Sequence, residues 1–228
     1  MTIQFDGPPH SVVTPSPGSG RGRWRALVLL CLAQFMVILD VTVVNVAVPV
    51  IGTDLQLGQA ALTWVVTAYT LCFGGLMLLG GRLSDVLGRR TTFLAGLILF
   101  TVASLLAGLA QGDATLVAAR AGQGVGAALL SPSALAIVIT MFHGAERNRA
   151  LGVWAAIGGS GAAVGVLAGG LLTEYASWRW VFLINLPIGV AVAALVPMVV
   201  PSAGPAGRRR VDVPGALTAT LAAGLLIY

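Results

Sequence analysis

The sequence contains no lysine, and only 9% of its 228 residues are charged. Hydrophobic residues make up 57%, a proportion that a soluble domain could not carry without exposing large apolar surfaces. The basic residues are all arginines, and they occur in short clusters separated by long uncharged runs. Such clusters cannot follow a phosphate backbone, so nucleic acid is not an expected partner. The composition predicts an all-α membrane protein surrounded by lipid.

Residue sets that carry enzyme chemistry are also missing. The sequence has no P-loop pattern, no paired carboxylates, no Ser/His/Asp set and no Cys/His spacing of a metal site. Its two cysteines, Cys31 and Cys72, both lie inside apolar runs and are interpreted as small core residues. We therefore expect neither an enzyme nor a bound metal or cofactor.

Apolar stretches divide the chain into four parts. Residues 1–23 are rich in Pro, Gly and Ser and predict a disordered cytoplasmic tail. Residues 24–200 hold six apolar stretches, each close to the roughly 20 residues that a bilayer core requires. Residues 201–213 predict an Arg-rich cytoplasmic loop, and residues 214–228 begin a seventh stretch that is too short to cross. The predicted spans are 26–50, 61–80, 91–110, 115–142, 150–172 and 181–200.

Arginines occur in alternate loops, and this predicts the orientation of the chain. Eleven of the 13 basic residues lie before the first span or in the loops that follow the second, fourth and sixth spans. Because Arg in short loops is retained on the cytoplasmic side during insertion, the N-terminus is predicted to be cytoplasmic. The first apolar run is too long for a signal peptide. A multi-pass protein of the plasma (inner) membrane is expected.

Two ionisable side chains fall inside the predicted spans, where an ionised group costs at least about 2.5–3.5 kcal/mol. Counting about 1.5 Å per residue places Asp40 and Arg120 at similar depths below the outer surface. They could form a buried ion pair, or reach the interface separately, and serve only helix packing. The alternative hypothesis is that Asp40 binds and releases a proton, because burial favours its neutral form and the approach of Arg120 favours its charged form.

Glycines recur along the fifth predicted span. Gly161, Gly165 and Gly169 are spaced by four and would form a flat strip that another helix can approach closely. Gly152 and Gly170 belong to the same pattern. A packing role and a gating role both stay open, because small-residue seams occur in many membrane bundles.

Residues 81–90 predict a cytoplasmic loop between the second and third spans. Gly81 and Gly88 would permit tight turns. Asp85 would accept hydrogen bonds from helix N-terminal amides or pair with a nearby Arg. The cationic side chains of this loop could hold anionic lipid headgroups; they are Arg82, Arg89 and Arg90.

Aromatic and amide side chains inside the spans are candidates for a substrate cavity. Aromatic residues in apolar helices more often face lipid or core, so this assignment has a structural alternative. The candidates are Phe35, Asn45, Trp64, Tyr69, Phe73 and Gln123. Interface anchoring explains the remaining tryptophans better; these are Trp24, Trp178 and Trp180.

Several of these segments together resemble motifs of the major facilitator superfamily. Residues 81–90 resemble its signature between spans two and three, and residues 39–49, 120–126 and 152–170 resemble motifs of its fourteen-span drug/proton antiporter branch. Residues 178–189 resemble the entry to span six, and Asp212 with Gly215 resembles the start of span seven. Arg120 corresponds to an Arg that the family uses in proton transfer. Val166 departs from the pattern, because the family usually has Pro there.

The resemblance covers residues 24–228 and implies the N-terminal six-helix bundle of the major facilitator fold, built from two three-helix repeats. It implies a proton-coupled efflux transporter (antiporter) for drug-like or other small organic molecules, which works by alternating access. The small-molecule site would be shared with a missing C-terminal half. Two alternatives stay open: a metabolite or siderophore importer of the same superfamily, and a half-length fragment that transports nothing.

Overall fold

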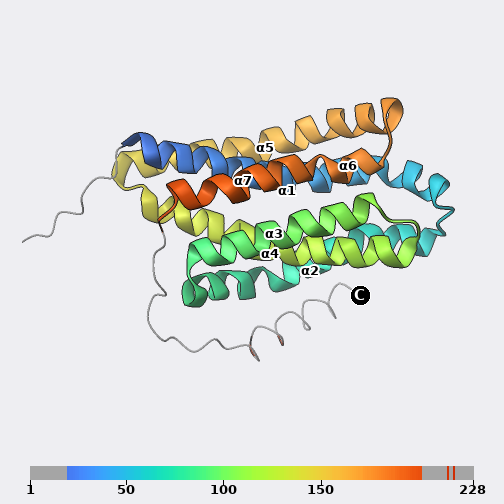
Figure 1. Ribbon diagram of the computed structural model, residues 1–228, viewed down its shortest axis with the longest axis horizontal. Helices are drawn as coiled ribbons and strands as arrows, with labels where there is room; N and C mark the ends of the chain where they lie inside the picture. The colour runs from blue at the N-terminus through green and yellow to red at the C-terminus, as the bar shows by residue number, and fades with distance from the viewer. Residues whose placement is uncertain (1–19, 202–214, 216–217, 219–228) are drawn as a thin grey trace, which may run out of the picture.

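The computed structural model describes residues 20–201 together with Gly215 and Thr218. These residues are largely helical and include no strand, in agreement with the predicted fold class. Figure 1 shows the helices lying roughly parallel to the long axis of the molecule. They are α1 (Gly20–Asp54), α2 (Gln59–Leu87), α3 (Arg89–Gly108), α4 (Asp113–Met141), α5 (Gly144–Tyr175), α6 (Arg179–Leu183) and α7 (Asn185–Val199).

Six segments among the described residues are long and apolar enough to cross a membrane, which agrees with the predicted number of spans. The sixth segment combines α6 and α7. The helix breaks at Ile184, and Pro187 in the first turn of α7 has no N–H with which to bond the carbonyl of Leu183. This break fixes the position at which the side chain of Asn185 enters the bundle.

The first helix begins at Gly20, inside the range predicted as a disordered tail. Polar contacts hold this first turn against the rest of the bundle. Arg23 Nη1 donates to the backbone oxygen of Met141 at 3.5 Å, and Arg23 pairs with Glu146 at 3.3 Å. The rest of the predicted tail, the loop 202–213 and most of the stretch 214–228 lie outside the described residues.

The prediction that residues 81–90 form a loop is wrong. Helix α2 continues through this segment to Leu87, and the single residue Gly88 connects it to α3. Gly88 has φ 94°, a conformation that side-chain-bearing residues rarely adopt. Gly81 lies in the helix and makes no turn. The chain reverses its direction at this one glycine, because the polar end of α2 stays helical beyond the apolar part of the bundle.

Helix α4 packs along α2 and α3, whereas α1 packs along α5 and α7. Glycines permit the close approach of α4 to its neighbours. A Cβ atom on Gly124 would lie 2.5 Å from the backbone oxygen of Tyr69 in α2, and one on Gly126 would lie 2.7 Å from the backbone nitrogen of Phe100 in α3. Real Cβ contacts are essentially never this short. The absence of side chains here lets α4 lie between its two neighbours.

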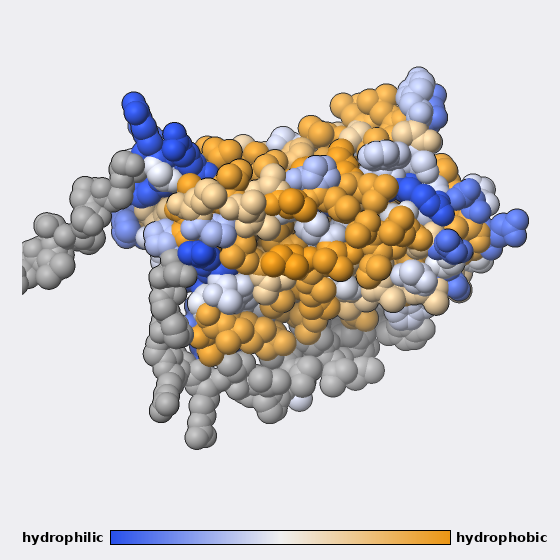
Figure 2. Space-filling view, viewed as in Figure 1, coloured by the Kyte–Doolittle hydropathy of each residue, from blue (hydrophilic) through white to orange (hydrophobic). Residues whose placement is uncertain are grey.

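Polar residues gather at the two ends of the bundle, and an apolar belt lies between them on the face shown in Figure 2. At one end of the bundle, the start of α1 meets the junctions α2–α3 and α4–α5. We call it the Arg-rich end, because a group of arginines lies there. Its arginines are Arg21, Arg23, Arg25, Arg82, Arg89, Arg90, Arg147 and Arg149. An apolar belt between polar ends is the surface that a bilayer requires.

The opposite end is fastened by one acidic side chain. Asp54 Oδ2 accepts a hydrogen bond from Trp178 Nε1 at 2.8 Å and pairs with Arg179 Nη1 at 3.2 Å. Arg179 Nη2 also donates to the backbone oxygen of Ala110 at 3.1 Å. These contacts join the ends of α1 and α3 to the start of α6.

Candidate functional site

Asp40 of α1 and Arg120 of α4 meet in the interior of the bundle. Their exposed fractions are 0% and 1%. Arg120 Nη1 donates to Asp40 Oδ2 at 2.6 Å, so the two opposite charges form a direct ion pair. The sequence places these residues at similar depth, and the structure brings them into contact. Their role in proton coupling stays a prediction.

Gln123 and Ser104 extend the ion pair into a network. Gln123 lies three residues after Arg120 on α4, so the two side chains share one helix face. Its Oε1 accepts from Arg120 Nη1 at 2.8 Å, and its Nε2 donates to Asp40 Oδ1 at 2.9 Å and to Ser104 Oγ at 2.8 Å. Ser104 Oγ donates in turn to the backbone oxygen of Phe100 at 2.8 Å within α3. One hydroxyl thereby ties α3 to α4.

Asn185, the first residue of α7, completes the network. Its Nδ2 donates to Asp40 Oδ1 at 2.9 Å and to Ser104 Oγ at 3.3 Å. Its side chain is fully buried, like those of Asp40, Ser104 and Gln123. We call the following five residues the Asp40 network: Asp40, Ser104, Arg120, Gln123 and Asn185.

Arg120 also holds helix α2. Its Nε donates to the backbone oxygen of Val65 at 3.1 Å. The guanidinium carbon lies 4.3 Å from the centre of the Tyr69 ring, within the range of a cation–π contact. The guanidinium and the carboxylate therefore join the segments that contain α1, α2, α4 and α7, and Ser104 connects α3 to them through Gln123 and Asn185.

The charges of the Asp40 network are compensated by hydrogen bonds. Asp40 accepts from Arg120, Gln123 and Asn185, and Arg120 donates to a carboxylate, an amide oxygen and a backbone oxygen. Removing one partner of a buried pair costs about 3–5 kcal/mol, because the other charge is left unpaired. A carboxylate in this position must rearrange its contacts when it is protonated. The arrangement can therefore link proton binding to helix position.

The structure brings some of the residues predicted for a substrate cavity together around Arg120. Tyr69 and Gln123 are buried at Arg120, and Phe73 lies next to Tyr69 with ring centres 5.8 Å apart. Trp64 and Asn45 are exposed on the bundle surface. Phe35 is half-buried and lies against Gly161 of α5. A substrate site built from these residues stays a prediction.

Three of the five motif glycines of α5 form a contact strip against α1. A Cβ atom on Gly161 would lie 3.0 Å from the Ile38 side chain, one on Gly165 would lie 2.7 Å from Thr42, and one on Gly169 would lie 3.1 Å from Val46. We call Gly161, Gly165 and Gly169 the α5 glycine strip. The other two motif glycines, Gly152 and Gly170, would place a Cβ atom in open space.

The signature residues of the segment 81–90 lie at the Arg-rich end. Asp85 is exposed near the end of α2, and Arg89 and Arg90 occupy the first turn of α3. Arg90 Nη1 donates to the backbone oxygen of Val200 at 3.2 Å and so fastens the end of α7. The predicted binding of anionic lipid by these arginines stays a prediction.

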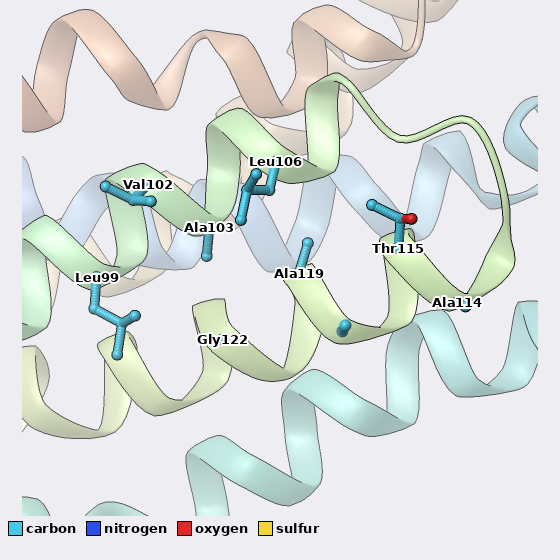
Figure 3. Close-up of a pocket in the computed structure, with 9 residues that line it drawn as sticks. Leu99, Val102, Ala103, Leu106, Ala114, Thr115, Ala119 and Gly122 are labelled. Carbon is cyan, nitrogen blue, oxygen red and sulfur yellow. The ribbon is translucent and has the colours of Figure 1, made fainter.

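An apolar groove lies between α3 and α4, on the part of the bundle drawn in Figure 3. Its volume is about 500 Å³. It has no ionisable residue in its lining, which consists of Leu99, Val102, Ala103, Leu106, Ala114, Thr115, Ala118, Ala119 and Gly122. Such a surface is suited to apolar chains and offers no group for proton chemistry.

Sequence reasoning assigned no role to Ser104 or Asn185. Both are polar residues inside predicted apolar spans, and this is the signal that could have selected them. Asn185 belongs to the motif 178–189, and Gln123 belongs to the motif 120–126 and is a cavity candidate. Their convergence on Asp40 depends on how α3, α4 and α7 are rotated toward α1.

Comparisons with known proteins agree with this geometry. Residues 30–227 match the family model described as Major Facilitator Superfamily. The chain is 50% identical over 204 residues to the cephamycin export protein CmcT of Amycolatopsis lactamdurans. This match covers 88% of this chain and 42% of that protein. The chain is 50% identical over 197 residues to the puromycin resistance protein pur8 of Streptomyces alboniger, with coverages of 86% and 39%.

A further relative is the lincomycin resistance protein of Streptomyces lincolnensis, which is 43% identical over 213 residues and covers 91% of this chain and 43% of that protein. The chain thus spans about two fifths of the length of these curated relatives. Among solved structures, a bacterial homologue of the human lysosomal transporter Spinster matches with a TM-score of 0.70 at 22% identity, over 86% of this chain and 47% of that chain. The peptide transporter POT matches with a TM-score of 0.72 at 16% identity, over 89% and 45%. At these identities the structural matches show a shared fold.

Proposed function

Because the chain belongs to the Major Facilitator Superfamily, we propose that it supplies the N-terminal six-helix bundle of a proton-coupled exporter of drug-like organic molecules. Relatives named for cephamycin export and for puromycin and lincomycin resistance support this substrate class. The observation that carries the proposal is the ion pair of Asp40 and Arg120, which is buried at the centre of the Asp40 network.

In the proposed cycle, Asp40 takes a proton from the outer side and releases it toward the cytoplasm. Protonation removes the negative charge that holds Arg120, so the contact between α1 and α4 weakens and the bundle can change its tilt. Export substrate binds while the site is open to the cytoplasm and leaves when it is open to the outside. The α5 glycine strip permits α1 and α5 to remain in close contact while the bundle moves.

A second bundle of similar size completes the proposed site. The coverage of 42% and 39% of the first two relatives supports a transporter with more spans than these six. Helices α2 and α5 supply faces for the second bundle, because only 17% of the apolar window of each is buried. Reading the DNA past the codon for Tyr228 tests this part: further apolar spans in frame support it, and an immediate stop codon contradicts a shared site within one chain.

We also propose that the protein lies in the plasma (inner) membrane and that its Arg-rich end faces the cytoplasm. The rule that Arg in short loops stays on the cytoplasmic side supports this orientation. It places the N-terminus in the cytoplasm and Asp40 nearer the outer surface. A proton arriving from outside would then reach Asp40 through the outer half of the bundle.

The proposed function is tested by Asp40→Asn in the full-length transporter, assayed in everted membrane vesicles. Asparagine keeps the shape of the side chain and one acceptor oxygen but cannot gain and lose a proton at neutral pH. We expect drug-dependent proton movement to fall by at least about tenfold, the factor that corresponds to about 1.4 kcal/mol. The measurement is the recovery of the fluorescence of a pH-sensitive dye in the vesicle lumen after drug is added.

Asp113→Asn is the matched control, because Asp113 is an exposed acidic residue at the start of α4. This variant should couple drug and proton movement like the wild type. Equal coupling in wild type and Asp40→Asn would refute the proton-carrying role. Flat results for a panel of antibiotics on the wild type would refute the substrate class.

A further inference from the structure

We propose that Asn185 is a positioning residue that serves both protonation states of Asp40. Its Nδ2 donates to the carboxylate, and after a half-turn of the amide its Oδ1 accepts a hydrogen bond from the protonated carboxyl. The inference rests on the proposed function, in which Asp40 carries the transported proton. It assigns to α7 a direct part in proton binding.

The geometry selects the oxygen of Asp40 that receives the proton. Oδ2 faces the positive charge of Arg120 at 2.6 Å, which opposes a proton there. Oδ1 faces the amides of Gln123 and Asn185, each at 2.9 Å. A proton from solvent therefore binds at Oδ1 and turns that oxygen from an acceptor into a hydroxyl, which can both donate and accept. Because both amides present N–H groups to it, the new O–H needs an acceptor.

Asn185 provides that acceptor at the lowest cost. Its Oδ1 is buried and has no hydrogen-bond partner among the residues that the structure describes. The Oε1 atom of Gln123 is already bound by Arg120 at 2.8 Å, and turning this amide would set N–H groups against the guanidinium. A half-turn of Asn185 exchanges its N–H bond to Asp40 for a bond accepted from the new O–H, and it gives up a longer bond, at 3.3 Å, to Ser104.

Ser104 cannot take the place of Asn185. Its Oγ accepts from Gln123 and from Asn185, which occupies both lone pairs, and it donates to the backbone oxygen of Phe100. Gln123 Nε2 can keep its bond to Asp40 in both states, because a hydroxyl oxygen still accepts. Only the amide of Asn185 has to change when the proton binds or leaves.

Few charged groups compete for control of Asp40. Arg120 of α4 is its ionic partner, and Tyr69 of α2 lies against the flat face of that guanidinium. The ionisable residues of α3 lie in its first turn, and those of α5 lie in its first two turns and its last turn. Arg179 is the first residue of α6, and α7 has no ionisable residue. Loss of the Asn185 amide should therefore be visible in the titration of Asp40.

The test uses infrared spectroscopy of the full-length transporter in lipid nanodiscs across a pH series. The carboxyl band that is absent from Asp40→Asn is assigned to Asp40. The matched variants are Asn185→Val and Asn185→Thr, which differ from each other only by a methyl group in place of a hydroxyl. The threonine hydroxyl can donate to a carboxylate or accept from a carboxyl, whereas valine can do neither.

In Asn185→Val, the pH at which half of Asp40 is protonated should rise by about one unit, a tenfold change in proton concentration. The direction follows because the bond lost from the charged state is stronger than the bond lost from the neutral state. Asn185→Thr should return the midpoint toward the wild type. Ser133→Ala is the control, because Ser133 is a buried hydroxyl of α4 that bonds Leu129 within its own helix; its midpoint should equal that of the wild type.

The outcomes separate the two proposals. If the wild type shows no titrating Asp40 band, the proton-carrying role of Asp40 fails. If the band titrates but Asn185→Val leaves its midpoint unchanged, the role of Asn185 is overturned while that of Asp40 stands. Equal shifts in the Val and Thr variants also overturn it, because a packing defect alone would explain them. Should the valine variant not fold, Asn185→Ala and Asn185→Ser provide the same comparison.

Discussion

Arg120 illustrates why the residue type matters at a buried cation. Its fork places Nη1 on Asp40 and Gln123 and Nε on the backbone of Val65, while the flat face of the guanidinium contacts Tyr69. A lysine ammonium is a point charge without this planar set of donors. The side chain therefore sets the spacing of α1, α2 and α4 as well as neutralising Asp40.

We predict that Arg120→Lys keeps the charge but destabilises the full-length protein by about 1–3 kcal/mol, because at least one buried acceptor loses its donor. The expected result is a melting temperature several degrees lower in detergent. Arg149→Lys is the control, since Arg149 is exposed near the start of α5. A melting temperature for Arg120→Lys equal to that of this control would show that the fork geometry contributes nothing.

At the scale of the helix, the glycines of the α5 motif have different surroundings, although they belong to one sequence pattern. Gly165 packs against Thr42 of α1, where there is no room for a methyl group. Gly152 lies on the same helix and in the same motif, yet it would place a methyl group in open space. The contact of α1 with α5 therefore depends on only part of the motif. Val166, where the resembling motif has Pro, is exposed, so the strip itself does not involve it.

We predict that Gly165→Ala destabilises the full-length protein by about 1–3 kcal/mol, the usual cost of an extra carbon in a tightly packed contact. Gly152→Ala should leave the melting temperature unchanged or raise it slightly, because alanine favours a helix more than glycine does. Thermal unfolding of the two variants under identical conditions makes the comparison. Equal loss of stability in both would contradict the assignment of the contact strip.

At the scale of the whole molecule, the distribution of polar residues orients the bundle. Arginines gather at one end, whereas Asp54, Asp113 and Glu174 lie at the other, and apolar side chains cover the region between them on the face in Figure 2. The six spans therefore cross in alternating directions, and residues at opposite ends should be reached from opposite sides of the membrane.

Cysteine labelling tests this arrangement. In a full-length protein with Cys31 and Cys72 replaced by serine, we expect Tyr175→Cys to react with a membrane-impermeant thiol reagent in intact cells and Leu87→Cys to react only in everted vesicles. Both side chains are exposed, at 76% and 55%, so access to them depends on the membrane side. Labelling of both cysteines from the same side would contradict the topology.

The sequence by itself determined the features that depend on local composition. Apolar runs of sufficient length specify six spans because an exposed backbone cannot be satisfied in lipid, and the clusters of Arg specify which ends lie together. The depth of Asp40 and Arg120 also follows from counting residues along a helix. Helix ends were less predictable: α2 continues to Leu87 because polar residues can stay helical beyond the apolar core, so the expected loop is reduced to Gly88.

Only the tertiary structure decided which polar groups share a site. Asn185 is 145 residues away from the carboxylate that it contacts, and Ser104 and Gln123 come from two further helices. Spans that are apolar on nearly every face carry little information about their rotation, so sequence could not show which side chains point inward. Close packing at glycines such as Gly124 and Gly165 fixes that rotation, because only small residues let the backbones approach.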